Sequence, residues 1–136
     1  PLYNSIKDTW GTNVTVLEHI GDGFVELVER LEFSGKNAEE IIKNSVKPLV
    51  SKGADCLVLG CTHYPFLKET IEKVANEIKP KSTLFVDVYD SAPAIAKNVF
   101  NILSEKGIPL EESHNTIELH SSGSNKCLEK LFEECL

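Results

Sequence analysis

Residues 56–65, CLVLGCTHYP, decide the fold of this chain. The four apolar residues at 56–59 lie between an aspartate and a glycine, and such a run is typical of a strand covered by helices on both faces. Pro65 then stands where a helix can begin, because the first helical position needs no backbone N–H. A strand followed by a short loop and a helix predicts a parallel sheet.

Strand and helix patterns alternate on both sides of this stretch. Apolar residues at helical spacing predict helices over 24–31, 37–50, 65–78, 94–103 and 126–135, and strand patterns predict strands over 14–19, 83–88 and 115–120. Candidate caps are Ser34 or Asn37 for the second helix and Asp90 or Ser91 for the fourth. We therefore expect an α/β fold, an open doubly wound parallel sheet flanked by helices, with its ligand site at the carboxyl ends of the strands.

Composition excludes several classes of partner. A hydrophobic content of 41% in 136 residues suits one ordinary folded domain. No apolar run approaches the ~20 residues that cross a bilayer. The formal charge of -7 argues against a nucleic-acid or anionic-membrane surface, since either needs clustered Lys and Arg. We expect neither nucleic acid nor membrane as a partner.

The four cysteines are Cys56, Cys61, Cys127 and Cys135. Their spacing lacks the density of a small secreted scaffold and contains no CxxC pair, so we expect reduced thiols, a cytoplasmic location and no metal site.

The turn after the first apolar run carries the candidate chemistry. Unpaired N–H groups at a helix start would stabilise a thiolate at Cys61, and His63 could donate to the sulfur or move a proton. The alternatives are a buried, inert Cys61, a satisfied surface histidine, and Thr62 acting only as a helix cap.

The stretch Leu59–Pro65 (LGCTHYP) resembles the second cysteine motif of glutamate racemases. Residues 24–29 (FVELVE) are similar to another segment of that family, with Glu26 replacing a proline and Gly-Asp-Gly replacing the flanking Cys-Pro-Leu. Residues 90–96 (DSAPAIA) are similar to a third, with alanine for a glycine and proline for a glutamate, and His120–Gly123 resembles the terminal strand and loop. The resemblance covers nearly the whole chain and only the carboxy-terminal half of the family.

The resemblance implies a cofactor-independent isomerase that interconverts L- and D-glutamate with two opposed thiols and supplies D-glutamate for peptidoglycan. It needs neither pyridoxal phosphate nor metal. Cys61 would be the base for the L-enantiomer, His63 would support that thiol, and Thr62 and His63 would bind substrate. Glu29 matches an acidic residue near the family's active site, although a glutamate on a solvated helix face is the commonest arrangement.

The first catalytic cysteine of the family belongs to an Ala-Cys-Asn-Thr segment that does not occur here. The chain opens with Pro1 and has no methionine, so we expect a piece of a longer protein. Residues 1–89 would form the racemase domain that carries Cys61, and residues 90–136 would complete the missing amino-terminal domain. We expect the isolated chain to be inactive, with glutamate and the missing half as partners and a homodimer as a further possibility.

Other functions stay open from the sequence. An aspartate- or hydantoin-type racemase shares the superfamily, and a non-catalytic binding module would retain the motif as a remnant. A thiol hydrolase or redox protein is a further alternative, although no resolving cysteine lies near Cys61.

Overall fold

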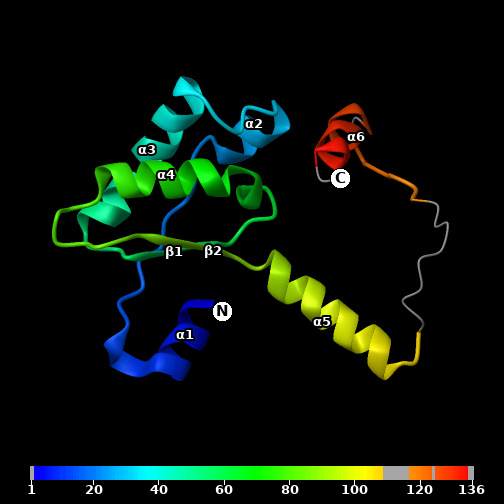
Figure 1. Ribbon diagram of the computed structural model, residues 1–136, viewed down its shortest axis with the longest axis horizontal. Helices are drawn as coiled ribbons and strands as arrows, with labels where there is room; N and C mark the ends of the chain where they lie inside the picture. The colour runs from blue at the N-terminus through cyan, green and yellow to red at the C-terminus, as the bar shows by residue number, and fades with distance from the viewer. Residues whose placement is uncertain (1, 109–116, 124, 135–136) are drawn as a thin grey trace.

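The computed structural model describes residues 2–108, 117–123 and 125–134 (Figure 1). Its elements are α1 (Leu2–Trp10), the 3-10 helix η1 (Gly11–Asn13), α2 (Phe24–Glu29), α3 (Lys36–Ser51), β1 (Cys56–Leu59), the 3-10 helix η2 (Tyr64–Leu67), α4 (Lys68–Ile78), β2 (Asp87–Asp90), α5 (Ala92–Glu105) and α6 (Asn125–Glu133). The expected helices are all present within the described ranges, and α1 is an addition that the sequence analysis did not predict.

The two strands form a parallel sheet in which Cys56 pairs with Asp87 and Leu59 with Asp90. Helices α3 and α4 lie together on one face of this sheet (Figure 1). Leu57 and Leu59 point into that face and are buried, whereas the alternate residues of β1 are exposed. The prediction of a parallel α/β fold is confirmed. The expectation that helices cover β1 on both faces is wrong for the described residues, which leave the second face open.

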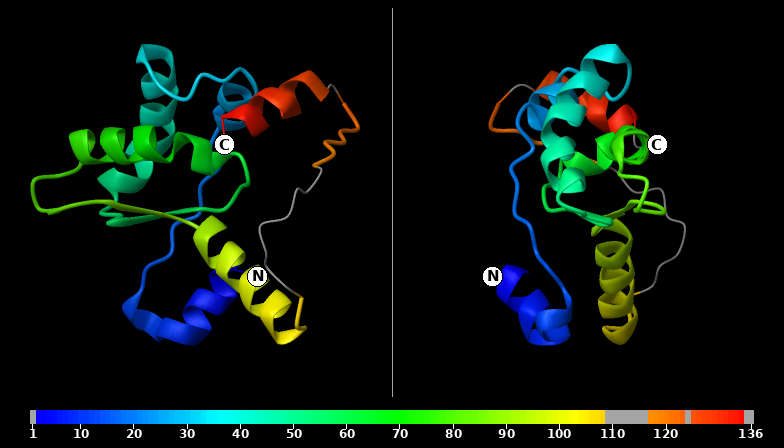
Figure 2. Two further views of the ribbon diagram at one scale, coloured as in Figure 1. Left: turned by 45° about the vertical axis from the view of Figure 1, so that its right-hand side comes forward. Right: turned by 90° about the vertical axis from the view of Figure 1, so that its left-hand side faces the viewer.

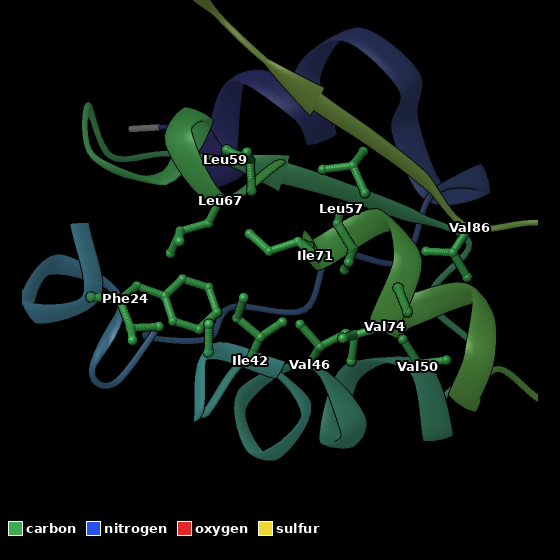
Figure 3. Packing of buried hydrophobic residues seen from close by; sticks show 14 of the residues in the cluster. Phe24, Ile42, Val46, Val50, Leu57, Leu59, Leu67, Ile71, Val74 and Val86 are labelled. Atoms are coloured by element: carbon green, nitrogen blue, oxygen red, sulfur yellow. The ribbon is translucent and has the colours of Figure 1, made fainter. Parts of the chain in front are cut away.

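The core lies between the sheet and this helical layer (Figure 3). Helix α3 contributes Ile42, Val46 and Val50, which are four residues apart and therefore share one face. Side chains from the other elements meet that face: Phe24, Leu27, Val28, Leu57, Leu59, Leu67, Ile71, Val74, Ala75, Val86 and Val88. This layer holds the strand ends, and thus the turn after β1, in a fixed position.

Three strand predictions fail in part. Residues 14–19 have no strand partner among the described residues, and the alternation of apolar residues cannot make a strand without one. The strand expected at 83–88 starts only at Asp87. The side-chain amide of Asn76 accepts a hydrogen bond from the Val86 N–H at 2.9 Å and donates one to the Val86 carbonyl at 3.0 Å, and these bonds take the place of a neighbouring strand. Residues 117–120 are not a strand, and 115–116 lie outside the described residues.

Two capping predictions have different outcomes. The α3 cap is Gly35, with φ 94°, and not Ser34 or Asn37; the Asn37 amide instead donates to the Glu32 carboxylate at 2.6 Å. For α5 the N-cap residue is Ser91, whose side chain forms no cap hydrogen bond, and Oδ1 of the preceding Asp90 accepts the Ala92 N–H at 3.0 Å. Helix α2 also ends sooner than predicted, and Leu31 adopts a left-handed conformation with φ 61°.

Helix α5 leaves the end of β2 and extends away from the layer formed by α3 and α4 (Figure 2). It contains no buried residue, and its apolar side chains Ile95, Val99 and Phe100 are exposed. Helix α6 lies beside α2, where Leu131 packs against the core (Figure 2). The chain after β2 therefore contributes little to the core described above.

Candidate functional site

The turn between β1 and η2 lies at the carboxyl end of the parallel strands. Tyr64 N–H donates to the Cys61 carbonyl and Phe66 N–H to the His63 carbonyl, both at 3.2 Å, so the turn is closed by its own backbone. Open α/β sheets bind their ligands at this edge, and the predicted location of the site therefore agrees with the fold.

Within this turn the Cys61 sulfur lies 4.0 Å from Nδ1 of His63, and both side chains are half-buried. The sulfur and the ring are neighbours that a ligand can still approach. A proton can pass between an imidazole and a thiol only when the ring nitrogen that faces the sulfur is in the matching tautomer. The arrangement is thus suited to acid–base chemistry at sulfur.

The helix start is farther from the thiol than expected. The four-residue η2 separates the turn from α4, which begins at Lys68, and the effect of a helix dipole falls off within one turn. Thr62 is exposed and forms no hydrogen bond within the described parts of the chain, so the interpretation of Thr62 as a helix cap is wrong. Its hydroxyl is free to meet a ligand.

Glu29 lies at the opposite end of α2 from Phe24, whose ring contacts Tyr64 beside this turn. It is the last residue of α2 and is exposed. Its backbone carbonyl accepts a hydrogen bond from the Cys127 thiol, with sulfur and oxygen 3.6 Å apart. It lines a shallow hollow between α2 and α6 with Arg30 and Lys130. No hydrogen bond or ion pair joins Glu29 to His63 in the described ranges. The structure therefore brings Cys61, Thr62 and His63 together, but not Glu29.

Tyr64 is a residue to which the sequence analysis gave no role. Its hydroxyl accepts the Gly21 N–H at 3.2 Å, and its ring lies edge-on to Phe24, with ring centres 5.1 Å apart. The paired glycines at 21 and 23 beside an aromatic residue were the only sequence signal of this contact.

A half-buried ion pair borders the same strand ends. Lys68 Nζ lies 2.8 Å from Oδ2 of Asp90, whose side chain is only 8% exposed. The hydrogen bond from Lys68 is the main cause that lowers the pKa of Asp90 below its ordinary value, and the Ala92 N–H adds to it. The carboxylate is thereby kept charged at the edge of the sheet.

Within the described residues, no other thiol forms a disulfide or a hydrogen bond with Cys61. Cys56, Cys61 and Cys127 are free, and Cys135 lies outside the described residues. Burial, followed by the charges of Asp55 and Asp87, raises the pKa of the Cys56 thiol. No cluster of three metal-ligand side chains occurs in the described part of the chain, and none of its helices is both long and apolar enough to cross a bilayer.

A thiol and an imidazole at the carboxyl edge of a parallel sheet define an α/β protein with a candidate acid–base or nucleophilic site. Comparisons with known proteins then narrow this class. No protein-family profile matches the chain. A curated glutamate racemase from Carboxydothermus hydrogenoformans is 36% identical over 108 residues, which are 79% of this chain and 37% of that protein.

Solved structures agree with this likeness. A glutamate racemase from Bacillus anthracis has a TM-score of 0.72 and 29% identity, over 98% of this chain and 48% of its own. Another from Francisella tularensis, in complex with D-glutamate, has a TM-score of 0.64 and 27% identity, over 83% of this chain and 39% of its own. The chain is thus similar to glutamate racemases over most of its length, as its motifs predicted, and it spans half or less of the length of these relatives.

Proposed function

We propose that this chain supplies one of the two catalytic groups of a glutamate racemase, and that the group is the Cys61 thiol. The contact of 4.0 Å between sulfur and imidazole, in a turn at the carboxyl edge of the sheet, carries the proposal. The relative from Francisella tularensis binds D-glutamate in its solved structure, which makes glutamate the substrate that we propose.

The proposed chemistry is proton transfer at the α-carbon. Cys61, as a thiolate, takes the α-proton of L-glutamate and becomes a thiol, while a second thiol gives a proton to the opposite face and becomes a thiolate. Inversion needs both groups, because a single base returns the proton mostly to the face that it left. In the reverse direction Cys61 is the acid. The reaction then needs no cofactor.

The neighbouring residues have supporting roles in this proposal. His63 donates to the sulfur or moves its proton, and the Thr62 hydroxyl binds a substrate carboxylate through a charge-assisted hydrogen bond. Glu29 would act on the substrate ammonium only if the rest of the enzyme brings it to the turn. It is therefore the weakest member of the proposed set.

We propose that the second thiol comes from the missing amino-terminal half. Cys56 is on the exposed sheet face and Cys127 is on α6, beside α2. We propose that residues 1–89 form the domain around Cys61 and that α5 leads into a domain completed by residues 90–136. Helix α5 contains no buried residue, and this supports the division. The proposed setting is the cytoplasmic supply of D-glutamate for peptidoglycan.

Assembly of two halves tests the function. The chain is co-expressed with the amino-terminal half of the Carboxydothermus hydrogenoformans racemase, and conversion of L-glutamate is followed by circular dichroism. We expect racemisation by the assembled halves and none by the chain alone. The matched control is the chain with Cys127→Ser, which should assemble and react normally. Racemisation by the chain alone would refute the proposed two-base division.

A further inference from the structure

Two turns far apart in the sequence meet at the side chain of Tyr64. Its backbone belongs to the Cys61 turn, because its N–H donates to the Cys61 carbonyl at 3.2 Å. Its side chain contacts the turn before α2, where the hydroxyl accepts a hydrogen bond from the Gly21 N–H at 3.2 Å. Tyr64 therefore connects two turns: its backbone contacts the candidate catalytic turn, and its side chain contacts the turn before α2.

The ring contact makes this connection rigid. The Tyr64 ring lies at 71° to Phe24, in an edge-on arrangement that aromatic pairs favour. Phe24 is only 4% exposed and belongs to the core, so Tyr64 rests on a fixed side chain. The hydroxyl fixes the end of the ring and Phe24 fixes its edge.

Gly21 permits the close approach of the two turns. A Cβ atom at this position would lie 2.7 Å from Cδ2 of Phe24 and 2.8 Å from the Tyr64 hydroxyl. Both distances are too short for a carbon atom, so any larger residue would separate the turns or displace the ring. The contact between Gly21 and Tyr64 therefore requires the absence of a side chain at position 21.

We infer that Tyr64 is a positioning residue that holds the Cys61–His63 turn in its closed form, and that Gly21 is required for this. The inference rests on the proposed role of Cys61 and deepens it. Tyr64 touches neither the reacting atoms nor the substrate in this account. It acts through the turn, by keeping the half-buried sulfur beside the imidazole.

Thiol alkylation of the whole chain tests the inference. Cys56→Ser is the background, because trypsin leaves Cys56 and Cys61 together in peptide 53–68. In this background Tyr64→Phe removes the hydroxyl but keeps the ring on Phe24, and Gly21→Ala inserts a methyl group. Tyr89→Phe is the matched control, since Tyr89 is exposed on the open face of the sheet. Iodoacetamide labelling is followed by mass spectrometry, with peptide 127–130 as an internal reference.

Loosening the turn exposes the sulfur, so we expect Cys61 labelling to rise about fivefold over the Cys127 reference in Tyr64→Phe, as loss of one hydrogen bond allows. Gly21→Ala should do at least as much, and Tyr89→Phe should change nothing. A lower melting temperature in Tyr64→Phe with an unchanged or reduced labelling ratio would overturn the inference, because a purely structural contact gives that result. The assay needs neither glutamate nor the second half, so its failure is distinct from failure of the proposed function.

Discussion

Nζ of Lys68 lies 2.8 Å from Oδ2 of Asp90, and this ion pair joins the first residue of α4 to the last residue of β2. Asp90 is also the register partner of Leu59, which precedes the Gly60–Cys61 turn. Its other oxygen accepts the Ala92 N–H at the start of α5. One carboxylate thus fixes the point at which α5 leaves the sheet, close to the candidate site.

The charge of Asp90 should make stability depend on acid. Its pKa is lowered in the folded chain, chiefly by Lys68, so its contribution is complete above the ordinary value of 3.8 and is lost as the pH falls through the lower folded pKa. We expect Asp90→Asn to reduce the free energy of unfolding at neutral pH and to have a smaller effect at about pH 3. Urea unfolding at both pH values measures this. Glu40→Gln, an exposed carboxylate on α3, is the control and should show no such dependence.

Asn76 should stabilise the chain by replacing a missing strand. Its side-chain amide forms hydrogen bonds with both the N–H and the carbonyl of Val86, which is fully buried. We expect Asn76→Ala to cost about 1–3 kcal/mol, because two buried polar groups lose their partners. Urea denaturation gives the value, with the exposed Asn44→Ala on α3 as the matched control. Equal stability of the two variants would mean that Val86 finds other partners.

The core and α5 should respond differently to truncation. Ile42→Ala removes a fully buried side chain between the helices and the sheet, so we expect a loss of about 2–5 kcal/mol. Ile95 on α5 is 58% exposed, and Ile95→Ala should change stability by no more than about 0.5 kcal/mol. Thermal unfolding of both variants measures the contrast. A comparable loss from Ile95→Ala would show that α5 is packed in solution.

Cys56 should react slowly although it is exposed. Burial of its sulfur and the charges of Asp55 and Asp87 raise the pKa of the thiol, so less thiolate is present at neutral pH. We expect Asp87→Asn to increase the rate at which Cys56 is alkylated, and Glu69→Gln, on the exposed side of α4, to leave it unchanged. Tandem mass spectrometry of the labelled peptide separates Cys56 from Cys61. A slower reaction in Asp87→Asn would contradict the assigned cause.

Sequence patterns predict elements that depend on local chemistry. Three local patterns correspond to observed elements: the apolar run at 56–59, Pro65, and the helical spacing of Ile42, Val46 and Val50. Each of these patterns depends only on residues within its own segment. Residues 14–19 have an equally clear pattern and form no strand, since pairing depends on a neighbour that the pattern does not contain. The start of β2 also depends on a distant residue, Asn76.

The candidate site also has one part that the sequence predicts and another that only the structure reveals. Cys61, Thr62 and His63 are close together because they are adjacent in the sequence, and this part was predictable. Glu29 was included by resemblance, and no contact in the described chain joins it to them. The contact between Tyr64 and Gly21 spans two turns, and only the structure reveals it.

The most direct test of the account is the Cys61→Ser variant in the assembled two-half enzyme, with loss of the α-proton of L-glutamate in D2O followed by NMR. A serine hydroxyl is a poor base at neutral pH, and general acid–base catalysis contributes about 10²–10⁴-fold. We predict that exchange from L-glutamate falls by about this factor, while Cys127→Ser retains the full rate. Exchange by Cys61→Ser at the unmodified rate would contradict the claim that this thiol transfers the proton.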